Sequence, residues 1–232
     1  MQDIEKLKIV EEKIGYKYND ISLLKLALTH KSYAYESENV TNNDFNERIE
    51  FLGDAILEHI ISDMLYKSDK IYSEGDMTKK RAAIVCETSL SLALKATGIH
   101  EYIYLGKCEL NSSVEKKDAI IADCFEAILG SIYLDGGYEK AKEFVLDKLK
   151  DEIKEVLEGK DFNTDYKTKL QEILQQNGSV KIEYHTLKEE GPEHDKTFYV
   201  EVTFNGKKIG EGVGKNKKSA EQAAAASAIK RI

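Results

Sequence analysis

Three acidic residues lie inside the otherwise apolar stretch from Asn46 to Leu57. Glu47, Glu50 and Asp54 are three and four residues apart, so a helix would place them on one face. Most of the remaining circumference is apolar, which predicts a largely buried helix: Ile49, Phe51, Leu52, Ala55, Ile56, Leu57, Ile60 and Ile61. Carboxylates in such surroundings require protons or cations to compensate their charge, and several that converge would suit a hard divalent metal.

A second acidic pair follows further along the chain. From Ala119 to Leu134, Asp123 and Glu126 are the only charged residues, and their spacing of three predicts a common helix face. Two such helices packed face to face would bring four carboxylates into one cage: Glu50, Asp54, Asp123 and Glu126. Ligation by oxygen alone favours Mg²⁺ or Mn²⁺ over Zn²⁺.

A hard metal in an acidic cage suggests phosphoryl chemistry, in which the ion polarises a phosphate, activates water and stabilises the leaving oxygen. In the alternative interpretation, the acids pair with Lys79, Lys80 or Arg81, or line a groove filled with water. A di-iron carboxylate bundle would need Glu-x-x-His on two helices, and this chain lacks that pattern. No glycine-rich phosphate loop or serine nucleophile elbow appears, and we expect no organic cofactor.

Composition predicts a cytoplasmic globular protein. The 232 residues are 41% hydrophobic and 33% charged, which allows one large or two modest domains. No secretory leader is visible, and the longest run that is light in charge is too short and too acidic for a membrane span. The three cysteines, Cys86, Cys108 and Cys124, have no CxxC spacing, which argues against disulfides and zinc and predicts buried thiols.

Charge is distributed unevenly along the chain, whose net charge is −8. Residues 161–232 contain 12 lysines and arginines against 11 acids, a net charge of +1, whereas residues 1–160 have a net charge of −9. From Lys207 to Ile232 the net charge is +5. An acidic body with a basic end therefore leaves a polyanionic partner possible.

Apolar residues at helical spacing predict an all-α first domain. The expected helices span residues 4–14, 21–28, 46–66, 73–97, 118–134 and 138–158, with a loop over 29–43. Asp20 is expected to cap the second helix, Gly98 to end the fourth, and the run 135–137 to end the fifth.

The pattern changes after a polar linker, residues 159–164. A helix over 166–176 precedes alternating strands, and Asn205-Gly206 predicts a hairpin between two of them. An alanine-rich helix from Lys217 ends the chain. We therefore expect two domains: an all-α domain, residues 1–158, and a small α+β domain, residues 165–232, with the order αβββα and a three-stranded antiparallel sheet.

Lysines begin the last helix of the small domain. Lys215, Lys217 and Lys218 would lie where unpaired backbone N–H groups and the helix dipole attract phosphate. The alternative is an ordinary solvated basic helix start.

These segments together resemble the bacterial ribonuclease III endonucleases. NERIEFLGDAIL (46–57) is similar to the family signature, and IIADCFEAILGSIYLDGG (120–137) to its second acidic block. LTHKSYA (28–34) and EGDMTKKRAAIV (74–85) are similar to further family segments. GKNKKSAEQAAAASAI (214–229) resembles the end of a double-stranded RNA-binding domain.

The resemblance implies roles for particular residues. It implies that Glu50, Asp54, Asp123 and Glu126 form a Mg²⁺ site, in which Mn²⁺ would substitute, with Asp54 and Glu126 most critical for cleavage. Glu47 and Glu74 match supporting acids of the same valley. The implied RNA contacts are Lys169, Glu172, the loop 191–194 with His194, and Lys215, Lys217 and Lys218.

The resemblance also implies an activity. The family acts as a homodimer, joined through the catalytic domain, on double-stranded RNA, which it reads by shape over about 16 bp. Each subunit would hydrolyse one strand and leave staggered ends with 5′-phosphates and 3′-hydroxyls, and the implied substrates are ribosomal RNA precursors and some mRNAs and tRNAs. Two alternatives are a catalytically silent, RNA-binding or ribosome-associated relative and a phosphodiesterase indifferent to duplexes.

Overall fold

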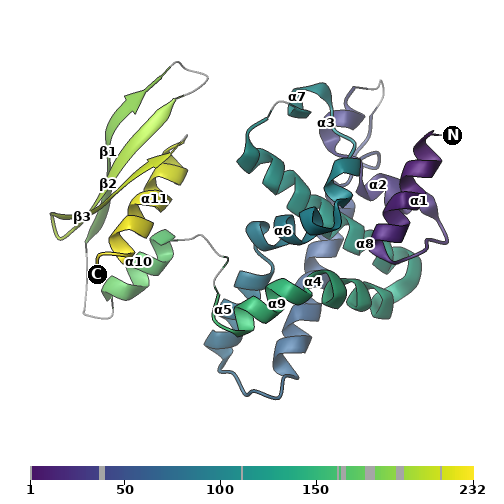
Figure 1. Cartoon of the computed structure of the whole chain (residues 1–232), viewed down its shortest axis with the longest axis horizontal. Helices are drawn as coiled ribbons and strands as arrows, with labels where there is room; N and C mark the ends of the chain where they lie inside the picture. Colours follow the sequence, from purple (N-terminus) through teal and green to yellow (C-terminus); the bar gives the residue numbers. More distant parts are fainter. Residues whose placement is uncertain are drawn as a thin grey trace. The chain divides into compact units, whose positions relative to one another are not determined.

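The computed structural model describes residues 2–36, 40–110, 112–160, 162, 166–175, 181–191, 196–214 and 216–232 (Figure 1). The chain divides into two compact units, residues 1–162 and 163–232. Each unit has its own hydrophobic core.

Unit 1 is helical, as its apolar periodicity predicts. Its helices are α1 (Gln2–Ile14), α2 (Ile21–Ala27), α3 (Lys31–Ala34), α4 (Glu47–Tyr66), α5 (Glu74–Ile84), α6 (Glu87–Thr97), the 3₁₀ turn η1 (Ile99–Tyr102), α7 (Lys107–Leu110), α8 (Val114–Lys148) and α9 (Lys150–Leu157). Asp20 caps α2 as expected, since its side chain accepts a hydrogen bond from the backbone N–H of Ser22. Gly98, in the left-handed conformation, ends α6 as expected.

Several predicted boundaries are wrong for local reasons. The expected helix over 73–97 is two helices, because Cys86 is extended and begins α6 as its N-cap. Helix α8 begins at Val114 rather than at 118, since the Ser113 hydroxyl caps it by accepting from the Lys116 N–H. The expected stop at 135–137, in contrast, is confirmed, because Gly137 has non-helical angles, φ +79° and ψ −176°, and two helices meet there at a kink within the range of α8. The predicted loop over 29–43 contains the short helix α3.

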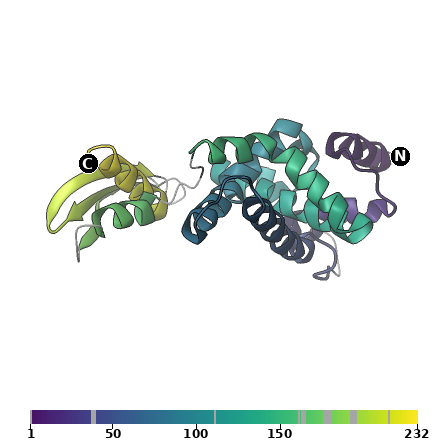
Figure 2. The same cartoon turned by 90° about the horizontal axis from the view of Figure 1, so that it is seen from below.

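Helices α4 and α8 form the centre of unit 1 and make its most extensive contact (Figures 1 and 2). The α4 side chains that face this core, among them Leu57, Ile60 and Ile61, are completely buried. Phe51, however, is 80% exposed, and Ala55 is exposed as well. The prediction of burial is therefore correct for one side of α4 and wrong for the side that bears Phe51.

Unit 2 has the predicted αβββα order. It consists of α10 (Tyr166–Gln175), β1 (Ile182–Glu190), β2 (Thr197–Phe204), β3 (Lys207–Gly214) and α11 (Lys217–Ile229). The strands form one antiparallel sheet in the order β1-β2-β3, and Asn205 and Gly206, both with positive φ, make the β2–β3 hairpin. Gly212 lets α11 approach closely, because a β-carbon there would lie 2.1 Å from the Ala224 nitrogen.

Composition predicts buried thiols and no membrane span. No helix in the described part of the chain is both long enough and apolar enough to cross a membrane. Cys124 is buried and Cys86 is half-buried, but Cys108 is exposed on the short surface helix α7, so the prediction of buried thiols is wrong for Cys108.

Candidate active site

Two glycines set the distance between the helices that carry the acids. A β-carbon on Gly53 of α4 would lie 1.8 Å from the backbone oxygen of Glu126, and one on Gly130 of α8 would lie 2.3 Å from the backbone oxygen of Ile49. Glycine inside a helix costs stability, so both positions are explained by the close crossing that they permit. The crossing places the acids that flank Gly53 opposite those that precede Gly130.

The four predicted carboxylates lie close enough at this crossing for their charges to act on one another. Glu50, Asp123 and Glu126 are half-buried, whereas Asp54 is exposed. Asp123 acts on Glu50 as a neighbouring charge, and both Asp54 and Glu50 act on Glu126. The prediction that the two helices pack with their acidic faces toward one another is therefore correct.

Burial and neighbouring negative charges make three of these residues, Glu50, Asp123 and Glu126, unusually weak acids. Desolvation, followed by the nearby Asp54 and Glu50 charges, raises the pKa of Glu126 to about 8. Desolvation, followed by the charges of Asp123 and Glu47, raises the pKa of Glu50 to about 7. Desolvation, followed by the Glu87 charge, raises the pKa of Asp123 to about 6. Near neutral pH the cluster therefore holds protons that a cation would displace.

None of the four carboxylates forms a hydrogen bond or an ion pair with another residue that the structure describes. The alternative in which Arg81 neutralises the cluster fails, because Arg81 Nε pairs with Glu58 at 2.6 Å and its guanidinium also donates to the Ser62 hydroxyl. Within the described ranges, no three acid, histidine or cysteine side chains gather closely enough to hold a metal ion. The donor chemistry fits a hard cation, which would have to draw the carboxylates inward.

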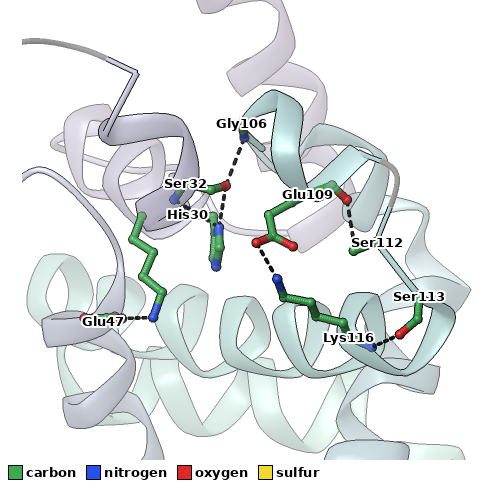
Figure 3. A network of polar contacts seen from close by, with 9 residues as sticks. His30, Ser32, Glu47, Gly106, Glu109, Ser112, Ser113 and Lys116 are labelled. Carbon is green, nitrogen blue, oxygen red and sulfur yellow. Dashed lines mark hydrogen bonds and ion pairs between the residues drawn. The ribbon is translucent and has the colours of Figure 1, made fainter. Parts of the chain in front are cut away.

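The two supporting acids lie in different places. Glu47, in the first turn of α4, forms an ion pair of 2.8 Å with Lys31 (Figure 3). The Glu47 charge also acts on Glu50 and Asp123. Glu74, in the first turn of α5, accepts a hydrogen bond from the Thr78 hydroxyl and lines another pocket, with His59 and Arg81 among its neighbours. Of these two supporting acids, Glu47 is the one whose charge acts on described carboxylates of the cluster.

The predicted RNA contacts belong to unit 2. Lys169 and Glu172 are exposed on α10, and Lys217 and Lys218 are exposed at the start of α11. Asn216 caps α11 by accepting from the Ser219 N–H, and Lys217 also pairs with Glu189 at 3.3 Å. His194 and Lys215 lie outside the described residues, as does most of the loop 191–194.

Helix α10 and the start of α11 share a groove that sequence reasoning missed. The groove has a volume of about 460 Å³ and is lined by Lys167, Thr168, Gln171, Gln175, Ile182, Tyr184, Lys218 and Gln222. Lys167 is fixed there, because its ammonium pairs with Glu221 at 2.6 Å and its backbone N–H donates to Gln222. Amide side chains on successive turns, Gln171 and Gln175, could have indicated this polar face.

Comparisons with known proteins identify both units. Residues 20–153 match the family described as Ribonuclease-III-like, and residues 166–232 match the double-stranded RNA binding motif. Ribonuclease 3 of Pelotomaculum thermopropionicum is 45% identical over 97% of this chain and 92% of its own length. Ribonuclease 3 of Enterococcus faecalis is 46% identical over 96% of each chain. The solved nuclease domain of the Campylobacter jejuni ribonuclease III is 36% identical over 64% of this chain and 97% of its own, with a TM-score of 0.56.

A helical nuclease-type domain followed by an αβββα RNA-binding domain defines a two-domain RNA-processing enzyme. The chain belongs to the ribonuclease III family and is an endoribonuclease of double-stranded RNA.

Proposed function

We propose that this chain cleaves double-stranded RNA by Mg²⁺-dependent hydrolysis, leaving 5′-phosphate and 3′-hydroxyl staggered ends. One observation supports the metal dependence above all others. Two crossing helices present four carboxylates that lack hydrogen bonds and ion pairs with the described residues, and burial weakens three of them as acids. A cation is the partner that such a cluster requires.

Glu50, Asp123 and Glu126 would hold the ion, with Asp54 and Glu126 most critical for cleavage. Bound Mg²⁺, or Mn²⁺ in its place, supplies polarisation of the phosphate, an activated water and stabilisation of the leaving oxygen. The residues of the chain must release their protons first, since metal ligands bind as carboxylates. Glu126, whose pKa is raised to about 8, is the last to do so as pH rises.

Unit 2 supplies affinity for the duplex. Lys169 and Glu172 on α10 and Lys217 and Lys218 on α11 are exposed, as RNA contacts require. We assign RNA contacts also to His194 and Lys215. The helix and the 191–194 loop suit successive minor grooves of A-form RNA, and the lysines suit the phosphates between them.

We further propose a homodimer joined through unit 1. Phe51 is 80% exposed, and Leu134 is 53% exposed beside a pocket of about 350 Å³ that Ile49, Leu52 and Phe45 help to line. Because neighbouring residues of α4 supply both an apolar projection, Phe51, and part of an apolar pocket, Ile49 and Leu52, this part of unit 1 can complement a second copy of itself across a two-fold axis. The solved Campylobacter jejuni nuclease domain has a region described as involved in dimer formation.

We also propose that the catalytic domain spans residues 1–158, the linker 159–164 and the RNA-binding domain 165–232. The protein would act in the cytoplasm on ribosomal RNA precursors and some mRNAs and tRNAs.

A labelled RNA duplex incubated with and without Mg²⁺ tests the proposed function. We expect cleavage only with the metal, and none of a single strand of the same sequence. An absence of cleavage with Mg²⁺ would support the catalytically silent relative, and equal cutting of the single strand would support a general phosphodiesterase.

A further inference from the structure

A lysine lies next to the four-acid cluster on a helix that the catalytic roles do not use. Lys31 begins α3, and its ammonium is 2.8 Å from a carboxylate oxygen of Glu47. Its charge also acts on Glu50 and Asp123, whose pKa values it lowers against the stronger effect of burial. Lys31 is therefore a cation that reaches the edge of the cluster without forming an ion pair with its members.

The backbone that carries Lys31 is held from several sides. The His30 N–H donates to the Tyr104 oxygen and the Tyr104 N–H to the Leu28 oxygen, which makes a short bridge between these segments. The Asn46 N–H donates to the Thr29 oxygen, so the same segment is tied to the start of α4. These bonds fix the position of Lys31 relative to the helix that bears Glu47 and Glu50.

His30 completes this support as the N-cap of α3 (Figure 3). Its Nδ1 accepts from the backbone N–H of Ser32 at 3.2 Å, so the neutral ring carries its proton on Nε2. The Ser32 hydroxyl lies 2.8 Å from Nδ1 and accepts from the Gly106 N–H at 3.0 Å. A β-carbon on Gly106 would lie 2.4 Å from the Ser32 oxygen, so only glycine permits this approach.

The side chain of Lys31, in contrast to its backbone, is available to a ligand. The ammonium and the Glu47 carboxylate are about half exposed, at 51% and 48% of their side-chain surfaces. Exposed ion pairs add little to stability, so an incoming phosphate can take the lysine from Glu47 at small cost. Unit 1 is acidic and repels RNA, which makes a cation at this edge valuable for binding.

We propose that Lys31 contacts a phosphate of the RNA strand that enters the four-acid site, and that the capped α3 turn, tied to Tyr104 and Gly106, holds it in position. This inference rests on the proposed function and adds to it a positioning contact in unit 1. Lys31 exchanges Glu47 for the phosphate when the duplex binds. The contact carries no base information, so its loss affects all duplexes alike.

Lys25 provides a matched control for the test. It forms an exposed ion pair with Asp3 at 3.0 Å, and the two side chains are 51% and 49% exposed, almost the same as Lys31 and Glu47. The experiment measures duplex affinity over a range of salt concentrations for the full chain and for Lys31→Gln, Lys31→Arg and Lys25→Gln. Each lysine that meets a phosphate contributes about 0.9 to the slope of log affinity against log salt concentration.

We expect Lys31→Gln to weaken binding and to lower the salt slope by about 0.9 for each Lys31 that meets the duplex, while Lys31→Arg and Lys25→Gln keep the slope. Glu47→Gln breaks the same ion pair but leaves the lysine charge, so it should keep the slope too. If Lys31→Gln and Lys25→Gln gave the same slope while the unmodified chain cleaved duplex with Mg²⁺, the Lys31 contact would be wrong and the proposed function would survive. An unmodified chain that failed to cleave would instead overturn the proposed function.

Discussion

Gly53 lies directly against the backbone of Glu126, so close that a β-carbon on the glycine would be 1.8 Å from the Glu126 oxygen. This contact brings the acid pair of α4 opposite the acid pair of α8. We expect Gly53→Ala to push the helices apart, destabilise unit 1 by about 1–3 kcal/mol as an overpacking change, and reduce cleavage by up to about 100-fold through misplaced carboxylates. Urea unfolding and single-turnover cleavage of a labelled duplex measure both effects.

Gly75→Ala is the matched control for that change. Gly75 is also a helical glycine, but a β-carbon there would meet nothing closer than the Ser73 hydroxyl at 4.0 Å. Alanine is the better helix former, so this variant should be neutral or more stable by up to about 1 kcal/mol. Equal effects of the two substitutions would contradict the role assigned to the crossing.

The weak acids of the cluster predict how stability changes with pH when metal is removed by a chelator. Burial and like charges raise the pKa of Glu126 from 4.5 to about 8 and that of Glu50 from 4.5 to about 7. Above pH 4.5 and below these raised pKa values, the folded chain keeps protons on Glu126 and Glu50 that the unfolded chain has released. The free energy of unfolding therefore falls as pH rises from about 5 to 8. Below pH 4.5 both glutamates are protonated in the folded and the unfolded chain, so their burial no longer lowers the free energy of unfolding.

Urea unfolding of Glu126→Gln against the unmodified chain isolates this effect. The glutamine is neutral at every pH, so the variant should become the more stable protein as pH approaches 8, and Mg²⁺ should restore stability to the unmodified chain alone. Glu143→Gln, an exposed α8 residue paired with Lys140, should leave the pH dependence unchanged. A stability difference between Glu126→Gln and the unmodified chain that did not change with pH would contradict the raised pKa of Glu126.

His30 predicts an effect that depends on its hydrogen bond and not on its volume. His30→Ala removes the cap of α3 and should cost about 1 kcal/mol, whereas His30→Asn retains a capping acceptor and should recover most of that loss. Burial lowers the pKa of His30 below its ordinary 6.5, so the folded chain keeps the ring neutral at pH values where the unfolded chain protonates it. The stability that comes with the neutral, capping ring is therefore complete above pH 6.5 and is lost as pH falls through the lowered pKa of His30. Denaturant unfolding at pH 7.5 and pH 5 measures both effects. A duplex salt slope that is lower by about 0.9 per Lys31 in His30→Ala, and restored in His30→Asn, would link the cap to Lys31. Equal slopes in the two variants would separate the cap from RNA binding.

Phe51 predicts the oligomeric state. Phe51→Asp places a charge on the surface proposed for the dimer, so sedimentation should show a dimer for the unmodified chain and a monomer for the variant. Tyr66→Ala changes another aromatic residue of α4, 79% exposed, and should leave the dimer intact. A dimer that persisted in Phe51→Asp would place the interface elsewhere.

The sequence predicts the order of elements and the partnership of the two acidic helices, because both depend on local periodicity and on the cost of burying charge. It does not predict where helices begin when a cap outweighs the apolar pattern, as Ser113 does at the start of α8. It also misses Gly53 and Lys31, because their importance comes from residues distant in the chain, Glu126 and Glu47. The exposure of Phe51 contradicts the burial expected from its apolar neighbours, since a monomer leaves that side of α4 uncovered.

Glu126→Gln tests the central claim that the cluster is a metal-dependent cleavage site. The substitution keeps the size of the side chain and removes the negative charge. With saturating Mg²⁺ and labelled duplex RNA, we expect single-turnover cleavage to fall by roughly 1,000-fold, since several kcal/mol of transition-state stabilisation depend on the metal, while duplex binding persists. Glu143→Gln should cleave at the rate of the unmodified chain. Cleavage by Glu126→Gln at that same rate would contradict the account.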